Sequence, residues 1–127
     1  MKLNTLFQAL LLMTAILILH ACGQEPGSEK ALLYGKWELK EASRNGSPTE
    51  SLAGLYYEFL ENDSMDTNLP LAPGKSMYEL DGNSLRQAAG PDEIEYTIES
   101  LDESNLVLAT VLRNTNFRFV LQKQPSQ

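Results

Sequence analysis

Hydrophobic residues follow two different patterns along the chain, and a polar stretch separates them. Residues 6–19 form an apolar run that only Gln8 and Thr14 interrupt. Residues 23–30 are polar, contain Gly, Pro and Ser, and show no apolar periodicity. From residue 34 onward, apolar residues recur at every second position in short runs between turn signals, a pattern typical of β-strands. The chain therefore divides into an apolar leader, a polar linker and a β-domain.

The β-domain contains seven segments that read as strands, and none with a sustained helical period. The strands are expected at residues 35–39, 55–60, 76–80, 85–88, 94–99, 106–112 and 117–121, with room for an eighth between Asp66 and Leu71. Turns with Asn-Gly or Asp-Gly fall at Asn45-Gly46 and Asp81-Gly82. Short strands joined by consecutive hairpins predict an all-β fold, a small antiparallel up-and-down β-barrel of about eight strands. Closing the barrel removes the exposed sheet edges.

The apolar leader predicts an N-terminal signal peptide. Its apolar run is shorter than the roughly 20 residues that a membrane-spanning helix needs, and Lys2 supplies a positive start. A buried helix and an uncleaved anchor are the alternatives. The run ends in Leu19-His20-Ala21-Cys22, which resembles the bacterial lipobox. That resemblance implies that the thiol of Cys22 receives a diacylglyceryl group, that cleavage occurs before Cys22, and that its new amine is acylated. Two or more acyl chains give stable membrane anchoring.

The expected organisation follows from these boundaries. Residues 1–21 are the lipoprotein signal peptide, 22–31 a flexible tether, 32–123 the barrel domain and 124–127 a polar tail. Gly23 is unlike the residues that retain bacterial lipoproteins in the inner membrane. The resemblance therefore implies a lipid-anchored protein of the outer membrane, and leaves open whether it faces the periplasm or the cell surface.

Charge and composition narrow the classes of function. The formal net charge is −7, which disfavours nucleic acid and anionic lipid as electrostatic partners. Membrane contact is therefore expected through the lipid on Cys22. Cys22 is the only cysteine and His20 the only histidine. Cleavage removes the histidine and lipidation consumes the thiol, which leaves no Ser-His or Cys-His nucleophile. We expect a non-enzymatic protein without a cofactor or a metal site.

The first strand of the domain begins with Gly35-Lys36-Trp37. A Gly-x-Trp sequence at the start of a meandering β-domain resembles the lipocalins, and the tethered form resembles small bacterial lipoproteins with a lipocalin-like domain. The resemblance implies that Trp37 plugs the closed end of the barrel and that a basic residue from the end of the chain covers it. Arg118 or Lys123 fits that description, and we assign Arg118 to the plug with Trp37.

A lipocalin-like barrel implies a small apolar ligand, bound by inward aromatic side chains. The candidates are Tyr57, Phe59, Tyr78, Tyr96, Phe117 and Phe119. Inward aromatic residues more often pack a core than line a cavity, so a filled interior is the favoured expectation. The alternative function is a structural or assembly lipoprotein whose solid barrel docks a protein partner. Its docking surface would be the apolar face of Val107, Ala109 and Val111, unless the linker and tail cover that face.

Two polar segments have further interpretations. Asp63-Ser64-Met65 resembles a three-residue O-glycosylation motif of exported proteins in some Gram-negative bacteria, which makes Ser64 a candidate glycan acceptor. The surrounding residues 62–66 lack the ordered ligand spacing of a dedicated calcium loop, so a polar loop is expected. Glu93, Glu95 and Glu99 lie at even spacings and predict the solvated face of a strand.

Overall fold

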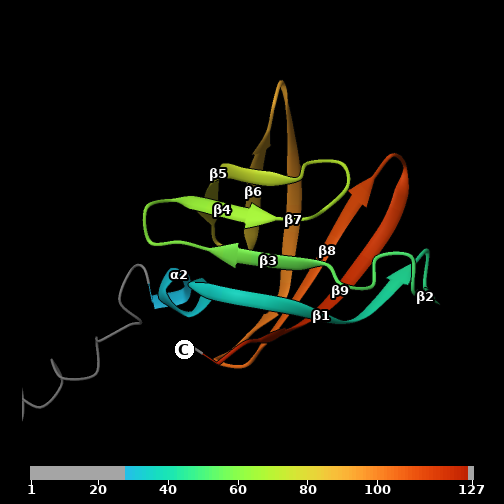
Figure 1. Cartoon of the computed structure of the whole chain (residues 1–127), viewed down its shortest axis with the longest axis horizontal. Helices are drawn as coiled ribbons and strands as arrows, with labels where there is room; N and C mark the ends of the chain where they lie inside the picture. Colours follow the sequence, from blue (N-terminus) through green and yellow to red (C-terminus); the bar gives the residue numbers. More distant parts are fainter. Residues whose placement is uncertain (1–27, 126–127) are drawn as a thin grey trace, which may run out of the picture.

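The computed structural model describes residues 28–125. The expected signal peptide, the expected lipidation site Cys22 and residues 22–27 of the expected tether lie outside this range. The described part contains one short helix and nine strands (Figure 1). They are α2 (Ser28–Leu33), β1 (Gly35–Arg44), β2 (Ser47–Thr49), β3 (Tyr56–Phe59), β4 (Ser64–Thr67), β5 (Gly74–Asp81), β6 (Ser84–Ala89), β7 (Asp92–Leu101), β8 (Asn105–Leu112) and β9 (Thr115–Lys123).

Eight of the strands form a closed antiparallel barrel. Each strand from β3 to β9 pairs with the next along the chain, β1 pairs with β3, and β1 also pairs with β9 to close the ring. The remaining strand, β2, pairs only with the end of β1 and extends it as a short hairpin. The turn of that hairpin holds Asn45 and Gly46 at positive φ, as an Asn-Gly sequence allows. The prediction of a small up-and-down barrel of about eight strands is confirmed.

Along each strand, the side chains point alternately into the barrel and toward its outer face. On β7, Ile94 and Tyr96 are buried and Glu93, Glu95 and Glu99 are exposed, as the sequence predicted. Two register shifts, at Leu39/Glu41 on β1 and at Ile98/Ser100 on β7, change the phase of this alternation. On β1 the shift lets both Trp37 and Ala42 point inward although they are five residues apart.

Two local features differ from the sequence expectation. The eighth strand lies at Ser64–Thr67, which begins two residues before the expected segment 66–71 and overlaps only its first two residues. Met65 and Thr67 are its buried pair, and a two-residue alternation is too short to stand out inside a polar loop. Residues 28–31, expected as the end of a flexible tether, belong to α2. A helix of six residues is too short to produce a hydrophobic period in the sequence, and burial of Leu33 stabilises it from within the barrel.

One end of the barrel, which we call the closed end, is sealed by α2 and Trp37. The indole Nε1 of Trp37 donates a hydrogen bond to the carbonyl oxygen of Leu33 at 2.8 Å. The ammonium group of Lys123 lies 5.0 Å from the centre of the Trp37 ring and donates to the carbonyl oxygen of Leu32 at 3.0 Å. Lys123 is also the direct cross-strand partner of Trp37. The plug therefore consists of Trp37, Lys123 and α2.

The assignment of Arg118 to this plug is wrong. Arg118 alternates with the inward residues Phe117 and Phe119, so its side chain is on the outer face. There its Nε lies 3.4 Å from a carboxylate oxygen of Glu99, and the guanidinium side chain is half exposed. The strand reaches the closed end only at Lys123.

Within residues 28–125, no helix has the length and apolar character that a membrane crossing requires.

Candidate ligand-binding site

The aromatic residues proposed as a ligand site form the packed core of the barrel. Five of the six are almost completely buried, namely Tyr57, Phe59, Tyr78, Tyr96 and Phe119. Their rings contact one another at centroid distances of 5.3 Å (Phe59 and Tyr78), 5.6 Å (Tyr57 and Tyr96) and 6.2 Å (Tyr57 and Phe59). These are ordinary packing distances for aromatic pairs. The favoured expectation of a filled interior therefore holds for this part of the barrel.

A buried chain of hydrogen bonds crosses the same core. The hydroxyl of Tyr57 donates to the hydroxyl of Tyr96 at 3.2 Å, and Tyr96 donates to the side-chain oxygen of Gln87 at 2.7 Å. The Gln87 amide reaches the carbonyl oxygen of Ala72, in the β4–β5 connection, at 3.4 Å. Burial raises the pKa of both tyrosines well above the ordinary value of 10, so both remain neutral donors under physiological conditions.

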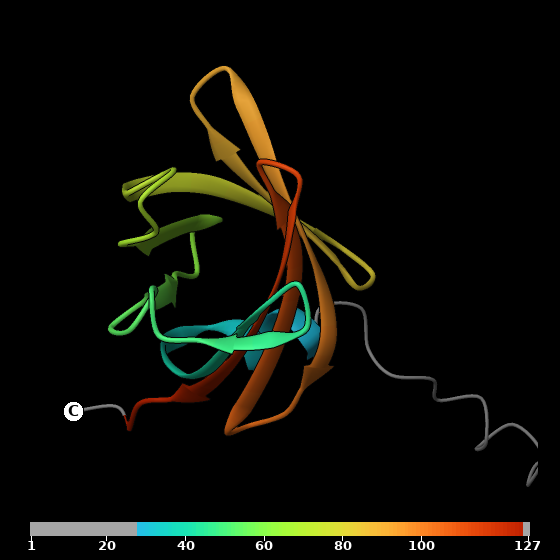
Figure 2. The same ribbon diagram turned by 90° about the vertical axis from the view of Figure 1, so that its right-hand side faces the viewer.

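The barrel wall is divided at the opposite end, which we call the open end. Pairing between β7 and β8 runs from Leu101↔Leu106 and stops at Tyr96↔Thr110. Beyond that point β7 stays with β6, and β8 stays with β9. At the point of divergence the hydroxyl of Thr110 donates to the carbonyl oxygen of Glu95 at 2.7 Å, where a backbone N–H would otherwise pair. The β6–β7 and β8–β9 hairpins therefore project separately, as Figures 1 and 2 show from two directions.

The space between these hairpins is a cleft of about 970 Å³. Ligand pockets usually have volumes of about 300–1,000 Å³, so the cleft is large enough for a small molecule. Its inner part is mainly apolar, and its outer part carries charge. The inner lining includes Leu71, Ala89, Ile94, Thr110, Leu112 and Phe117, and the charged residues are Asp92, Glu93, Glu95, Glu99, Arg113 and Arg118.

Sequence reasoning identified Phe117 in this lining but missed the cleft itself. Phe117 is half-buried and is the member of the aromatic set that reaches the cleft. The one sequence signal that pairing between β7 and β8 ends here was Thr110, a polar inward residue in the otherwise apolar run from Leu106 to Leu112. A polar residue facing inward in such a run can mark a hydrogen bond that replaces the ladder.

The outer face of β8 is covered unevenly. Val107 is 9% exposed and lies opposite Val120 of β9, whereas Val111 is 61% exposed. Ala109 lies between them and lines the cleft together with Val111. Gln124, the first residue of the expected tail, leads away from this face, because its backbone N–H donates to the carbonyl oxygen of Lys36 at the closed end.

A second hollow, of about 890 Å³, lies at the closed end beside the start of β1. Lys36, Glu38, Glu58 and Lys123 contribute to its wall, so it is polar and charged. It suits an apolar molecule less well than the cleft at the open end.

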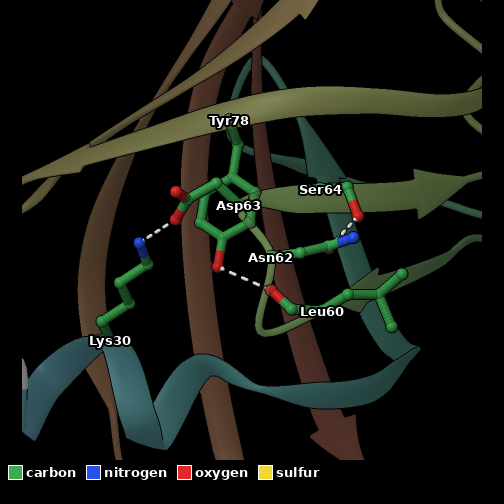
Figure 3. Close-up of polar contacts among 6 residues, drawn as sticks. All are labelled: Lys30, Leu60, Asn62, Asp63, Ser64 and Tyr78. Atoms are coloured by element: carbon green, nitrogen blue, oxygen red, sulfur yellow. Dashed lines mark hydrogen bonds and ion pairs between the residues drawn. The ribbon is translucent and has the colours of Figure 1, made fainter.

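Ser64 lies at the start of β4, beside a turn that is tied to α2 (Figure 3). Asp63 has a positive φ of 61° and forms an ion pair with Lys30 of α2, and the Ser64 hydroxyl hydrogen bonds to the side-chain oxygen of Asn62. In the same place the hydroxyl of Tyr78 lies 3.4 Å from the carbonyl oxygen of Leu60. Ser64 is half-buried, and its glycosylation stays a prediction.

The polar loop expected at residues 62–66 holds no calcium-type cage. Across residues 28–125, no group of three or more acidic, histidine or cysteine side chains is arranged to hold a metal ion. The carboxylate of Asp63, which precedes Ser64 in the chain, pairs with Lys30.

Comparison with known proteins supports the fold. No protein-family model matches this chain, and no curated protein matches it by sequence. The crystal structure of a lipocalin-like protein from Bacteroides uniformis is similar, with a TM-score of 0.55 and 19% sequence identity over 73% of this chain and 99% of that one. An uncharacterized protein from Bacteroides eggerthii has a TM-score of 0.53 and 16% identity over 72% and 99% of the two chains. The chain thus has a lipocalin-like barrel fold.

Proposed function

We propose that this chain is a lipid-anchored protein of the bacterial cell envelope that binds a small, mainly apolar molecule in the cleft at the open end of its barrel. The role is non-enzymatic, the anchor is the acylated Cys22, and the membrane is the outer membrane. The observation that carries the binding role is the contrast between the two ends of the barrel. Aromatic side chains fill the interior toward the closed end, and the free space lies between the β6–β7 and β8–β9 hairpins.

The lining of the cleft supports an apolar ligand with a polar end. Ile94 and Leu112 are buried in its inner part, and Phe117 and Leu71 are partly exposed to it. Covering such partly exposed apolar surface is favourable at roughly 25 cal/mol per Å². The charged outer part leaves room for a polar group in contact with water. This arrangement, an apolar floor with a few polar groups, is the usual form of a small-molecule site.

A pair of alanines on β6 provides a matched test of this site. Ala89 faces the cleft, whereas its neighbour Ala88 is exposed on the outer face of the same strand. With the neutral apolar dye Nile red as the probe, we expect Ala89→Trp to weaken binding by about tenfold or more, because the indole occupies the inner cleft. Ala88→Trp should bind the dye as the unchanged chain does. Equal binding by both variants would overturn the assignment of the cleft.

The anchor and the envelope location rest on the lipobox-like sequence. Protein extracted from a Gram-negative host should partition into detergent and carry the mass of a diacylglyceryl group and an amide-linked acyl chain on Cys22. Cys22→Ala should abolish both properties. A Cys22→Ala chain that still partitions into detergent would contradict the anchor.

The non-enzymatic role is supported by the side chains available for chemistry. Residues 28–125 contain neither histidine nor cysteine, and the carboxylates near the cleft are exposed on the outer face of β7. Carboxylates that face open solvent are poorly placed for general acid–base catalysis, which needs a group held against a bound substrate.

A second function, docking of a protein partner by a solid barrel, is favoured by the exposure of Val111. Its side chain is 61% exposed on the outer face next to Ala109. A photo-cross-linking residue at Ala109, with one at Ala88 as the control, should then capture an envelope protein at Ala109 alone. Absence of a specific product in intact envelopes would count against this function.

A further inference from the structure

The cleft at the open end is bordered by two unpaired strand edges. On one side, residues 92–95 of β7 pair with β6, from Asp92↔Ala89 to Glu95↔Arg86, and have no partner strand toward β8. On the other side, Val111 and Leu112 of β8 pair with β9 and have no partner strand toward β7. Unpaired edges can recruit a further strand, and closed barrels normally avoid them.

The direction of the backbone groups on β7 follows from one hydrogen bond. The carbonyl oxygen of Glu95 accepts the hydroxyl proton of Thr110, so the backbone polar groups of Glu95 point toward β8. In a strand, alternate residues direct their N–H and C=O groups to the same side. The N–H and C=O of Glu93 therefore also point into the cleft, where the ladder with β8 has already ended.

The side chains on the two faces of this edge differ in chemistry. Toward the interior, Ile94 of β7 and Leu112 of β8 are apolar and buried. Toward the outside, Glu93 and Glu95 are exposed carboxylates. A strand added along β7 would place its residues alternately beside these two sets, because side chains alternate between the faces of a sheet.

We infer that the cleft accepts an extended peptide segment as an added strand on the edge of β7, with apolar residues pointing into the barrel and Lys or Arg residues facing Glu93 and Glu95. The inference extends the proposed function, since it rests on the same cleft and adds a polymeric ligand to the small apolar molecule. Backbone hydrogen bonds to Glu93 supply affinity, and the alternating side chains supply selectivity. Opposite charges placed directly across neighbouring strands favour the pairing.

The charge of the chain favours a basic partner over a second copy of itself. The formal net charge is −7, and the outer side of this edge carries Glu93 and Glu95. Two copies that paired edge to edge here would place like charges opposite one another, which is unfavourable. A basic, apolar-alternating segment avoids that repulsion.

The test uses a capped peptide of about six residues with alternating valine and lysine, the usual length of a short strand. Hydrogen exchange of the ¹⁵N-labelled chain is followed by NMR as the peptide is added. We expect the amide of Glu93 to exchange at least about tenfold more slowly in the bound state, because its N–H gains a partner. The double variant Glu93→Gln/Glu95→Gln should bind at least about fivefold more weakly at low salt, and Glu103→Gln, in the β7–β8 turn at the closed end, should bind as the unchanged chain does.

Three results would overturn the inference. One is that an alternating valine–glutamate peptide binds as tightly as the alternating valine–lysine peptide does. Another is peptide binding that leaves the exchange of the Glu93 amide unchanged. The third is protection of Glu93 by concentration-dependent self-association without peptide, which would assign the edge to a second copy. Loss of Nile red binding in Ala89→Trp is read out separately, so the strand-addition inference and the small-molecule proposal can fail independently.

Discussion

The buried hydrogen bonds from Tyr57 to Tyr96 and from Tyr96 to Gln87 predict how much Tyr96→Phe lowers the stability of the barrel. The Tyr96 hydroxyl is the middle member, accepting from Tyr57 and donating to Gln87 at 3.2 Å and 2.7 Å. All three side chains are fully buried. Removing the middle hydroxyl therefore leaves two buried polar groups without their partner. Each such group costs about 1–3 kcal/mol, so we expect Tyr96→Phe to lower the free energy of unfolding by about 2–6 kcal/mol.

Tyr57 stands at the end of this series of hydrogen bonds, so Tyr57→Phe should lower the stability less than Tyr96→Phe does. Tyr57→Phe removes a donor, but the Tyr96 hydroxyl keeps its hydrogen bond to Gln87. The loss is then that of one ordinary hydrogen bond, about 0.5–1.5 kcal/mol. The double variant Tyr57→Phe/Tyr96→Phe should be no less stable than Tyr96→Phe alone, because the stranded Tyr57 hydroxyl is gone.

Urea unfolding of the three variants, followed by the fluorescence of the single tryptophan, measures these differences. Trp37 lies at the closed end and reports on the whole barrel without being part of the chain of hydrogen bonds. The comparison requires equal urea dependence of the unfolding free energy in all variants. The reasoning is refuted if Tyr57→Phe destabilises as much as Tyr96→Phe, or if the two effects simply add in the double variant.

Three further predictions concern the closed end, alkaline pH and Ser64. Lys123→Met should lower the free energy of unfolding by about 1–2 kcal/mol, since it removes the cation from the face of the Trp37 ring. Arg118→Met should change the free energy of unfolding by less than about 0.5 kcal/mol, because Arg118 forms only a half-exposed ion pair. Urea unfolding of both variants measures the difference, and equal effects would contradict the placement of Lys123 in the plug. Burial raises the pKa of Tyr78 from 10.0 to about 12, so the folded chain holds this proton more tightly than the unfolded chain. The contribution of Tyr78 to stability should therefore be constant below about pH 10 and be lost from there toward about pH 12, and Tyr78→Phe should make the alkaline fall in stability shallower in urea midpoints compared at about pH 9 and about pH 11. Intact-mass measurement of protein from a native-like Gram-negative host should show added hexose-type mass that Ser64→Ala removes, and an unmodified mass would exclude glycosylation there.

Much of the fold was predictable because apolar and polar residues alternate clearly within most strands. Ile94, Tyr96 and the intervening glutamates define β7 without ambiguity, and the same holds for the start of β1 at Trp37. Short elements without a period were not predictable. The strand at Ser64–Thr67 has one buried pair, and α2 is a helix of six residues that is held by tertiary contacts.

The candidate site was less accessible to sequence reasoning, because it depends on which strands stop pairing. The aromatic residues were correctly placed on inward faces, but direction alone does not distinguish a packed core from a cavity wall. Phe117 differs from Phe119 by its position one step nearer the open end, which no local pattern reveals. The choice between Arg118 and Lys123 depended in the same way on how far β9 extends toward the closed end. Because the two residues are an odd number of positions apart on one strand, their side chains point to opposite faces, and this much follows from the sequence alone.

The place where α2 enters the barrel determines the direction from which a ligand can arrive. Cys22 precedes Ser28 by six positions, and a chain spans at most about 3.5 Å per residue. The proposed lipid on Cys22 would therefore hold the start of α2 within about 20 Å of the bilayer surface. The closed end is next to α2, so the two projecting hairpins and the cleft between them lie at the end of the barrel farther from Ser28. In the proposed anchored form, the cleft would therefore be directed toward the aqueous compartment, and the proposed ligand would enter from that side rather than from the membrane plane.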